Sequence, residues 1–120
     1  MDKIILEKLN EKQNLLDRVS IPFRVTFDSE KKMVKKNVLT YNELKQIVDI
    51  ADEQFTKFRC YNFQKEGFEM LVDGYDVNIS FKQYGILRFI YDEVSSKINR
   101  LDYEICHYQK SKTESEPEME

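Results

Sequence analysis

The chain has 120 residues, of which 41% are hydrophobic and 34% charged, a balance typical of one globular domain. Its net charge of −3 at pH 7 argues against a general nucleic-acid binder, because such proteins usually carry a basic excess. No apolar run approaches the roughly 18 residues of a membrane span, and the N-terminus lacks the apolar core of a signal peptide.

Two cysteines, Cys60 and Cys106, are too few for a disulfide scaffold. We expect reduced, buried thiols and a cytoplasmic setting, with a single bridge between the two as the alternative. Lys, Ile and Asn are plentiful while Gly, Pro and Trp are scarce. This bias is typical of an AT-rich genome, such as that of a low-GC bacterium or its phage.

Residues 2–19 predict a first helix, with Ile5, Leu9 and Leu16 on one face, and Pro22 requires that it has ended. The stripe resembles half of a coiled-coil seam. It can pair with the C-terminal helix of the same chain or between two chains. We favour pairing within the chain, because the tyrosines of the C-terminal helix suit a globular core better than a strict coiled coil.

Residues 23–28 alternate apolar and polar side chains, which predicts a strand with one buried face. After a polar turn at 29–32, residues 33–39 predict a second strand, at the sheet edge because it is rich in lysine. Thr40 and Glu43 form a capping-box pattern, so a second helix should begin at 41 and run to about 57.

The pair Asp73-Gly74 predicts a two-residue hairpin turn, because both positions tolerate positive φ. This register sets Val72 opposite Tyr75 and places the apolar side chains of both strands on one face. A second turn at 66–67 would add a third strand over 61–65. Together these segments predict a three-strand antiparallel meander with one apolar face and one polar, solvent-exposed face.

Apolar residues at spacings of three and four predict a long C-terminal helix over 80–108, capped by Ser80 and Gln83. Residues 110–120 lack periodicity and predict a disordered acidic tail after a single domain at 1–109. The expected fold class is α+β. It is a two-layer domain in which helices cover one face of an antiparallel meander sheet, in the order αββαβββα.

The sequence contains no catalytic, cofactor-binding or metal-ligating pattern. His107 is the only histidine, and its neighbour Cys106 points to a different side of a helix. A Cys–His nucleophile would need Cys60 close to His107 in space. We therefore predict a protein that is not an enzyme, takes no cofactor and has no membrane contact.

The favoured hypothesis is a small regulator or inhibitor, encoded by a phage or mobile element, that binds another protein or itself. The end of the long helix would supply the contacts, because its apolar side chains need a partner there. The alternative is a nucleic-acid-associated accessory protein that uses a basic hairpin at residues 31–36. The interface candidates are Ile98, Leu101, Tyr103, Ile105 and Tyr108, and the nucleic-acid candidates are Lys31, Lys32, Lys35 and Lys36.

Overall fold

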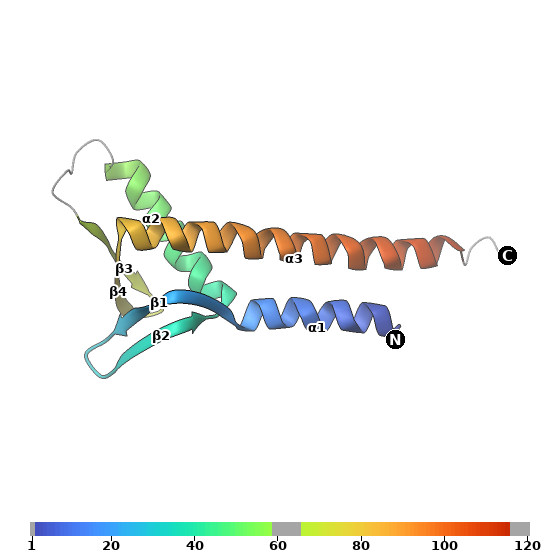
Figure 1. Cartoon of the computed structure of the whole chain (residues 1–120), viewed down its shortest axis with the longest axis horizontal. Helices are drawn as coiled ribbons and strands as arrows, with labels where there is room; N and C mark the ends of the chain where they lie inside the picture. Colours follow the sequence, from blue (N-terminus) through green and yellow to red (C-terminus); the bar gives the residue numbers. More distant parts are fainter. Residues whose placement is uncertain (1, 59–65, 116–120) are drawn as a thin grey trace.

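The computed structural model describes residues 2–58 and 66–115, and it has an α+β fold (Figure 1). Three helices and four strands follow one another along the chain. Their bounds are α1 Lys3–Asp17, β1 Val19–Asp28, β2 Met33–Leu39, α2 Tyr41–Phe58, β3 Gly67–Val72, β4 Tyr75–Ser80 and α3 Phe81–Ser115. The predicted fold class is confirmed. The third strand expected at 61–65 lies outside the described residues.

The four strands form one antiparallel sheet in the order β2-β1-β4-β3. The sheet therefore consists of two sequential hairpins joined through β1 and β4, where Phe27 pairs with Val77 and Asp28 with Asp76. This joining of distant segments differs from the expected meander of sequence neighbours. It arises because β4 uses its second edge to pair with β1 rather than leaving that edge in solvent.

β1 begins at Val19, four residues earlier than its predicted start, and its pairing with β2 is irregular between Ser20 and Val25. Pro22 lies within this irregular stretch. Proline has no N–H to donate to a ladder, so it is tolerated where regular pairing is interrupted. The same proline sets only the latest point at which α1 could end; the helix ends earlier, at Asp17, because Val19 already pairs with Leu39 in the sheet.

The β3–β4 hairpin confirms the predicted register, with Val72 opposite Tyr75. Asp73 and Gly74 both have positive φ, 51° and 84°, as a type I′ turn requires. Gly67 is the first residue of β3 rather than part of a turn. A Cβ there would lie 2.1 Å from the carbonyl oxygen of Ile79, so the close approach of the two backbones requires glycine.

Both predicted capping boxes are present. The Glu43 amide donates to Thr40 Oγ1 over 3.0 Å, and the Thr40 amide donates to the Glu43 carboxylate over 2.9 Å. The Gln83 amide likewise donates to Ser80 Oγ over 3.1 Å, and the Ser80 amide donates to Gln83 Oε1 over 2.9 Å. These reciprocal bonds satisfy backbone donors that the first helical turn cannot use, and so they fix where α2 and α3 begin.

The core lies between one face of the sheet and the helices α2 and α3. Fully buried side chains from all of these layers meet there: Val25, Leu39, Leu44, Ile47, Val48, Val72, Val77 and Leu87. Tyr41, at the start of α2, stacks on Tyr91 of α3 with ring centroids 5.5 Å apart. Its hydroxyl lies 2.7 Å from Ser95 Oγ. These contacts fix α2 against α3 above the sheet.

α3 has 35 residues and runs well beyond the sheet, with α1 antiparallel beside it (Figure 1). The molecule measures 68 × 34 × 23 Å, and its radius of gyration is 19.2 Å, against about 13–14 Å for a compact domain of this length. α3 ends at Ser115 rather than at 108, because residues 109–115 contain no Gly or Pro to stop it. The first part of the predicted disordered tail is therefore helical, and residues 116–120 lie outside the described residues.

Candidate protein-binding surfaces

α1 and residues 94–108 of α3 form a two-helix arm that projects from the sheet (Figure 1). Lys8 Nζ lies 2.5 Å from Glu104 Oε2, and Lys12 Nζ lies 2.7 Å from Asp102 Oδ1. At the tip, the hydroxyl of Tyr108 donates to Asp2 Oδ2 over 2.9 Å. The expectation that α1 pairs with the long helix within one chain is confirmed.

The five interface candidates differ in how far they are exposed once α1 lies against α3. Ile98 and Leu101 are buried, and Ile105 and Tyr108 are partly buried, whereas Tyr103 is 69% exposed. Because α1 supplies the partner that this stripe needed, the expectation of exposed anchors has to be corrected for Ile98 and Leu101. Tyr103 lies on another side of α3, where it stacks on His107 with ring centroids 5.8 Å apart.

Three apolar side chains near the start of α1 are exposed instead: Ile4 by 47%, Leu6 by 46% and Leu9 by 36%. Ile4 and Leu6 are two residues apart, so they point about 200° away from each other on the helix. A single neighbouring helix cannot cover both. Sequence reasoning placed Leu9 in the stripe and missed Ile4; the signal was an apolar run, 4–6, that is too broad for one helix face.

The four candidate lysines do not form one basic surface. Lys31 and Lys32 are exposed in the β1–β2 turn, and Lys35 is exposed on β2. Lys36 is engaged elsewhere: its Nζ lies 2.8 Å from Glu43 Oε2 and 4.9 Å from the centre of the Phe27 ring. Alternation along the strand sends Lys35 and Lys36 to opposite faces of the sheet, which disperses their charge.

The ion pair with Lys36 affects the pKa of Glu43. Burial by itself raises the pKa of the Glu43 carboxyl, but hydrogen bonds from Lys36 and from the Thr40 backbone outweigh it and leave that pKa below its ordinary value. The carboxylate therefore links the capping box of α2 to β2. This is a structural role for one of the four lysines.

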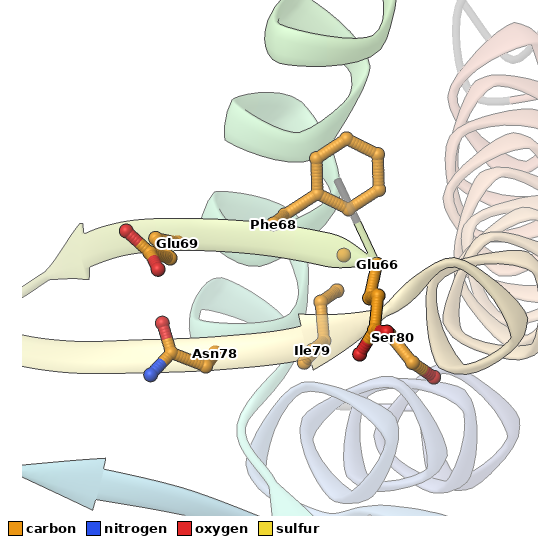
Figure 2. Close-up of a pocket in the computed structure, with 7 residues that line it drawn as sticks. Glu66, Phe68, Glu69, Asn78, Ile79 and Ser80 are labelled. Carbon is orange, nitrogen blue, oxygen red and sulfur yellow. The ribbon is translucent and has the colours of Figure 1, made fainter. Parts of the chain in front are cut away.

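The side of the sheet away from the helices is exposed, and we call it the open sheet face. Its exposed side chains come from all four strands: Asp28, Met33, Lys35, Glu69, Leu71, Asp76 and Asn78. A hollow of about 560 Å³ lies over Asp28, Leu71 and Asp76, and a second of about 370 Å³ follows it along β3 and β4. Figure 2 shows Glu69 and Asn78 beside each other on adjacent strands in the second hollow.

A polar network joins α2 to the start of α3. Arg88 Nη1 donates to both carboxylate oxygens of Asp52 over 2.7 Å, and the Tyr84 hydroxyl donates to the same carboxylate. Burial and this hydrogen bond to Asp52 raise the pKa of Tyr84. The groups satisfy one another, so the network fastens the two helices and offers no free acid or base.

The described residues contain no group of three or more His, Cys, Asp or Glu side chains that could hold a metal ion. Cys106 is free and exposed rather than buried as expected. Consecutive helical residues lie about 100° apart, so Ile105 and Cys106 cannot both face α1. Cys60, the other half of the Cys–His hypothesis, lies outside the described residues.

No known family model, curated protein or solved structure matches this chain. Among the helices in the described part of the chain, none is long and apolar enough to cross a membrane.

Proposed function

We propose that this chain is a small non-enzymatic regulator or inhibitor that binds another protein, or a second copy of itself, through the two-helix arm. A phage or mobile element is proposed as the source, and the bias toward Lys, Ile and Asn, which is typical of an AT-rich genome such as that of a low-GC bacterium or its phage, supports this. The observation that carries the proposal is the exposure of Ile4, Leu6 and Leu9 on flanks of α1 that α3 does not cover.

The exposed side chains supply a driving force for association. Complete burial of a Leu or Ile side chain contributes about 1.5–3 kcal/mol, and each of these three is between one-third and one-half exposed. Because Ile4 and Leu6 point in different directions, the partner has to reach α1 from more than one side. Helices that complete a bundle around the arm meet this requirement.

The attachment of α1 is also weak for a helix of its length. Of its 15 residues only Ile5 is buried. The ion pairs of Lys8 and Lys12 are partly exposed, and such pairs contribute about 0–1 kcal/mol each. A bound partner would therefore stabilise the arm as well as use it.

The test compares three versions of the full chain: wild type, an arm variant and a control. The arm variant carries Ile4→Ser, Leu6→Ser and Leu9→Ser. The control carries Phe89→Ser, which removes an exposed aromatic side chain from α3 outside the arm. Light scattering at several concentrations measures self-association, and affinity capture from a lysate of the encoding organism measures binding of other proteins.

We expect at least one of the two kinds of binding in the wild type and in the Phe89→Ser control. The arm variant should lose it while retaining the wild-type circular dichroism spectrum. Equal binding by the arm variant would reject the arm as the binding surface. A monomeric wild type that captures nothing would reject the function itself.

A further inference from the structure

On the open sheet face, two acidic side chains lie side by side between two exposed apolar side chains. One row of directly opposed residues crosses all four strands, because Met33 pairs with Asp28, Asp28 with Asp76, and Asp76 with Leu71. The row therefore reads Met33, Asp28, Asp76, Leu71. The two outer side chains are 62% and 65% exposed, and the two acids between them are exposed as well.

The acids of this face differ from those of the helices. On the helices, Asp52 is paired with Arg88, Asp102 with Lys12, and Glu104 with Lys8. Within the described residues, the carboxylates of Asp28, Glu69 and Asp76 form no ion pair and accept no hydrogen bond; the bond that Gln54 donates to Glu69 goes to its backbone carbonyl. Two like charges directly opposite each other on a ladder also destabilise the sheet. Lys35 lies on the same face, but none of the described acids there is ion-paired with it, so no direct contact neutralises their negative charge.

From this geometry we infer that the open sheet face binds a basic segment of a partner protein, at a surface separate from the arm. Cationic side chains of the segment would lie over Asp28 and Asp76, and apolar side chains would cover Met33 and Leu71. Binding would replace repulsion between the acids with attraction and remove two large apolar side chains from water. The described acids of the face form no group able to hold a metal ion, which favours an organic cation.

The spacing of the row indicates what such a segment looks like. Adjacent strands lie about 4.8 Å apart, so the four positions span about 14 Å. Residues i, i+3, i+7 and i+10 of a helix span about 15 Å on one side. A helix with an apolar residue, two lysines and a second apolar residue at these positions matches the row.

The test uses a labelled synthetic helix of 16 residues as the probe, with Leu, Lys, Lys and Leu at those positions and Ala and Gln elsewhere. A second peptide has Glu in place of both lysines. The full chain is titrated against each peptide by fluorescence anisotropy at 150 mM salt. Variants are Asp28→Asn with Asp76→Asn, and Met33→Ser with Leu71→Ser. Glu93→Gln, an exposed acid of α3, is the matched control.

We expect the lysine peptide to bind, and each double variant to weaken binding at least tenfold. Glu93→Gln should leave it unchanged, and the glutamate peptide should not bind. The arm variant should bind as wild type does, which separates this proposal from the proposed function. No binding of the lysine peptide would overturn the proposal. A loss of peptide binding in the Asp28→Asn, Asp76→Asn variant alone would also overturn it, because binding would then depend on charge attraction only.

One further outcome would overturn the assignment to a partner protein. Lys31 and Lys32 are exposed in the turn that follows Asp28, so a second copy of the chain is the other source of cations to test. In that case the chain would associate at low salt without peptide, and Lys31→Gln with Lys32→Gln would abolish the association.

Discussion

The hydroxyl of Tyr108 donates to Asp2 Oδ2 over 2.9 Å, and Asp2 Oδ1 accepts from the backbone amide of Ile4 over 2.9 Å. One carboxylate therefore caps α1 and joins its first turn to α3. Residues 106 positions apart in the chain close the tip of the arm. The stability of this end of α1 consequently depends on α3.

Replacing Tyr108 by phenylalanine should loosen the tip of the arm without affecting the sheet. Tyr108→Phe removes the hydroxyl and keeps the ring, so the amides of the first turns of α1 should exchange with solvent faster. Hydrogen exchange resolved by residue measures this. The control is Tyr103→Phe, because the Tyr103 hydroxyl makes no hydrogen bond within the described residues. Equal exchange in both variants would show that the Tyr108 contact does not hold α1.

Two adjacent residues of β3 should respond very differently to truncation. Val72 is completely buried and Leu71 is 65% exposed. Val72→Ala should lower the free energy of unfolding by about 2 kcal/mol through lost burial and a small cavity. Leu71→Ala should change it by less than about 0.5 kcal/mol. Urea denaturation measures both, and a larger effect at Leu71 would contradict the register of the sheet.

The capping box of α2 should make stability sensitive to acid. The pKa of Glu43 is depressed, so its contribution to stability is present above the ordinary glutamate pKa of about 4.3 and is lost as the pH falls through the folded value. Glu43→Gln keeps the box but not the ion pair with Lys36. The melting temperature of this variant should fall less between pH 7 and pH 3.5 than that of the wild type. Glu53→Gln, at an exposed position of α2, should behave as wild type does.

The opposed acids on the open sheet face should reduce stability at neutral pH. Asp76→Asn removes one of two like charges in direct register, so it should raise the free energy of unfolding by about 0.2–1 kcal/mol. Asp49→Asn breaks the ion pair with Lys45 and should lower it slightly. Chemical denaturation at pH 7 distinguishes the two, and destabilisation by Asp76→Asn would mean that the two carboxylates do not repel each other.

The features that could be predicted from sequence are those that local chemistry decides. The Asp73-Gly74 turn fixes its hairpin because both residues must adopt positive φ. The pairs Thr40–Glu43 and Ser80–Gln83 fix helix starts because each side chain reaches a backbone group only three residues away. Apolar alternation then identified the buried face of β3 and β4. None of these inferences required knowledge of the rest of the chain.

The features that could not be predicted depend on contacts between distant segments. The pairing of Asp28 with Asp76 joins the two hairpins, and neither strand pattern indicates it. Burial of Leu101 depends on where α1 lies, which periodicity alone left open between one chain and two. The exposure of Ile4 follows from the same placement. The candidate surfaces therefore became visible only once the elements were assembled.

The two-helix arm is the surface through which this protein is proposed to bind another polypeptide. The most direct test places a photo-crosslinking phenylalanine analogue at position 9 of the full chain in the encoding organism, with position 89 as the control. We expect a discrete crosslinked product from position 9, either with a second copy or with one other protein, and none from position 89. Absence of any product from position 9, or identical products from both positions, would show that the arm is not the binding surface.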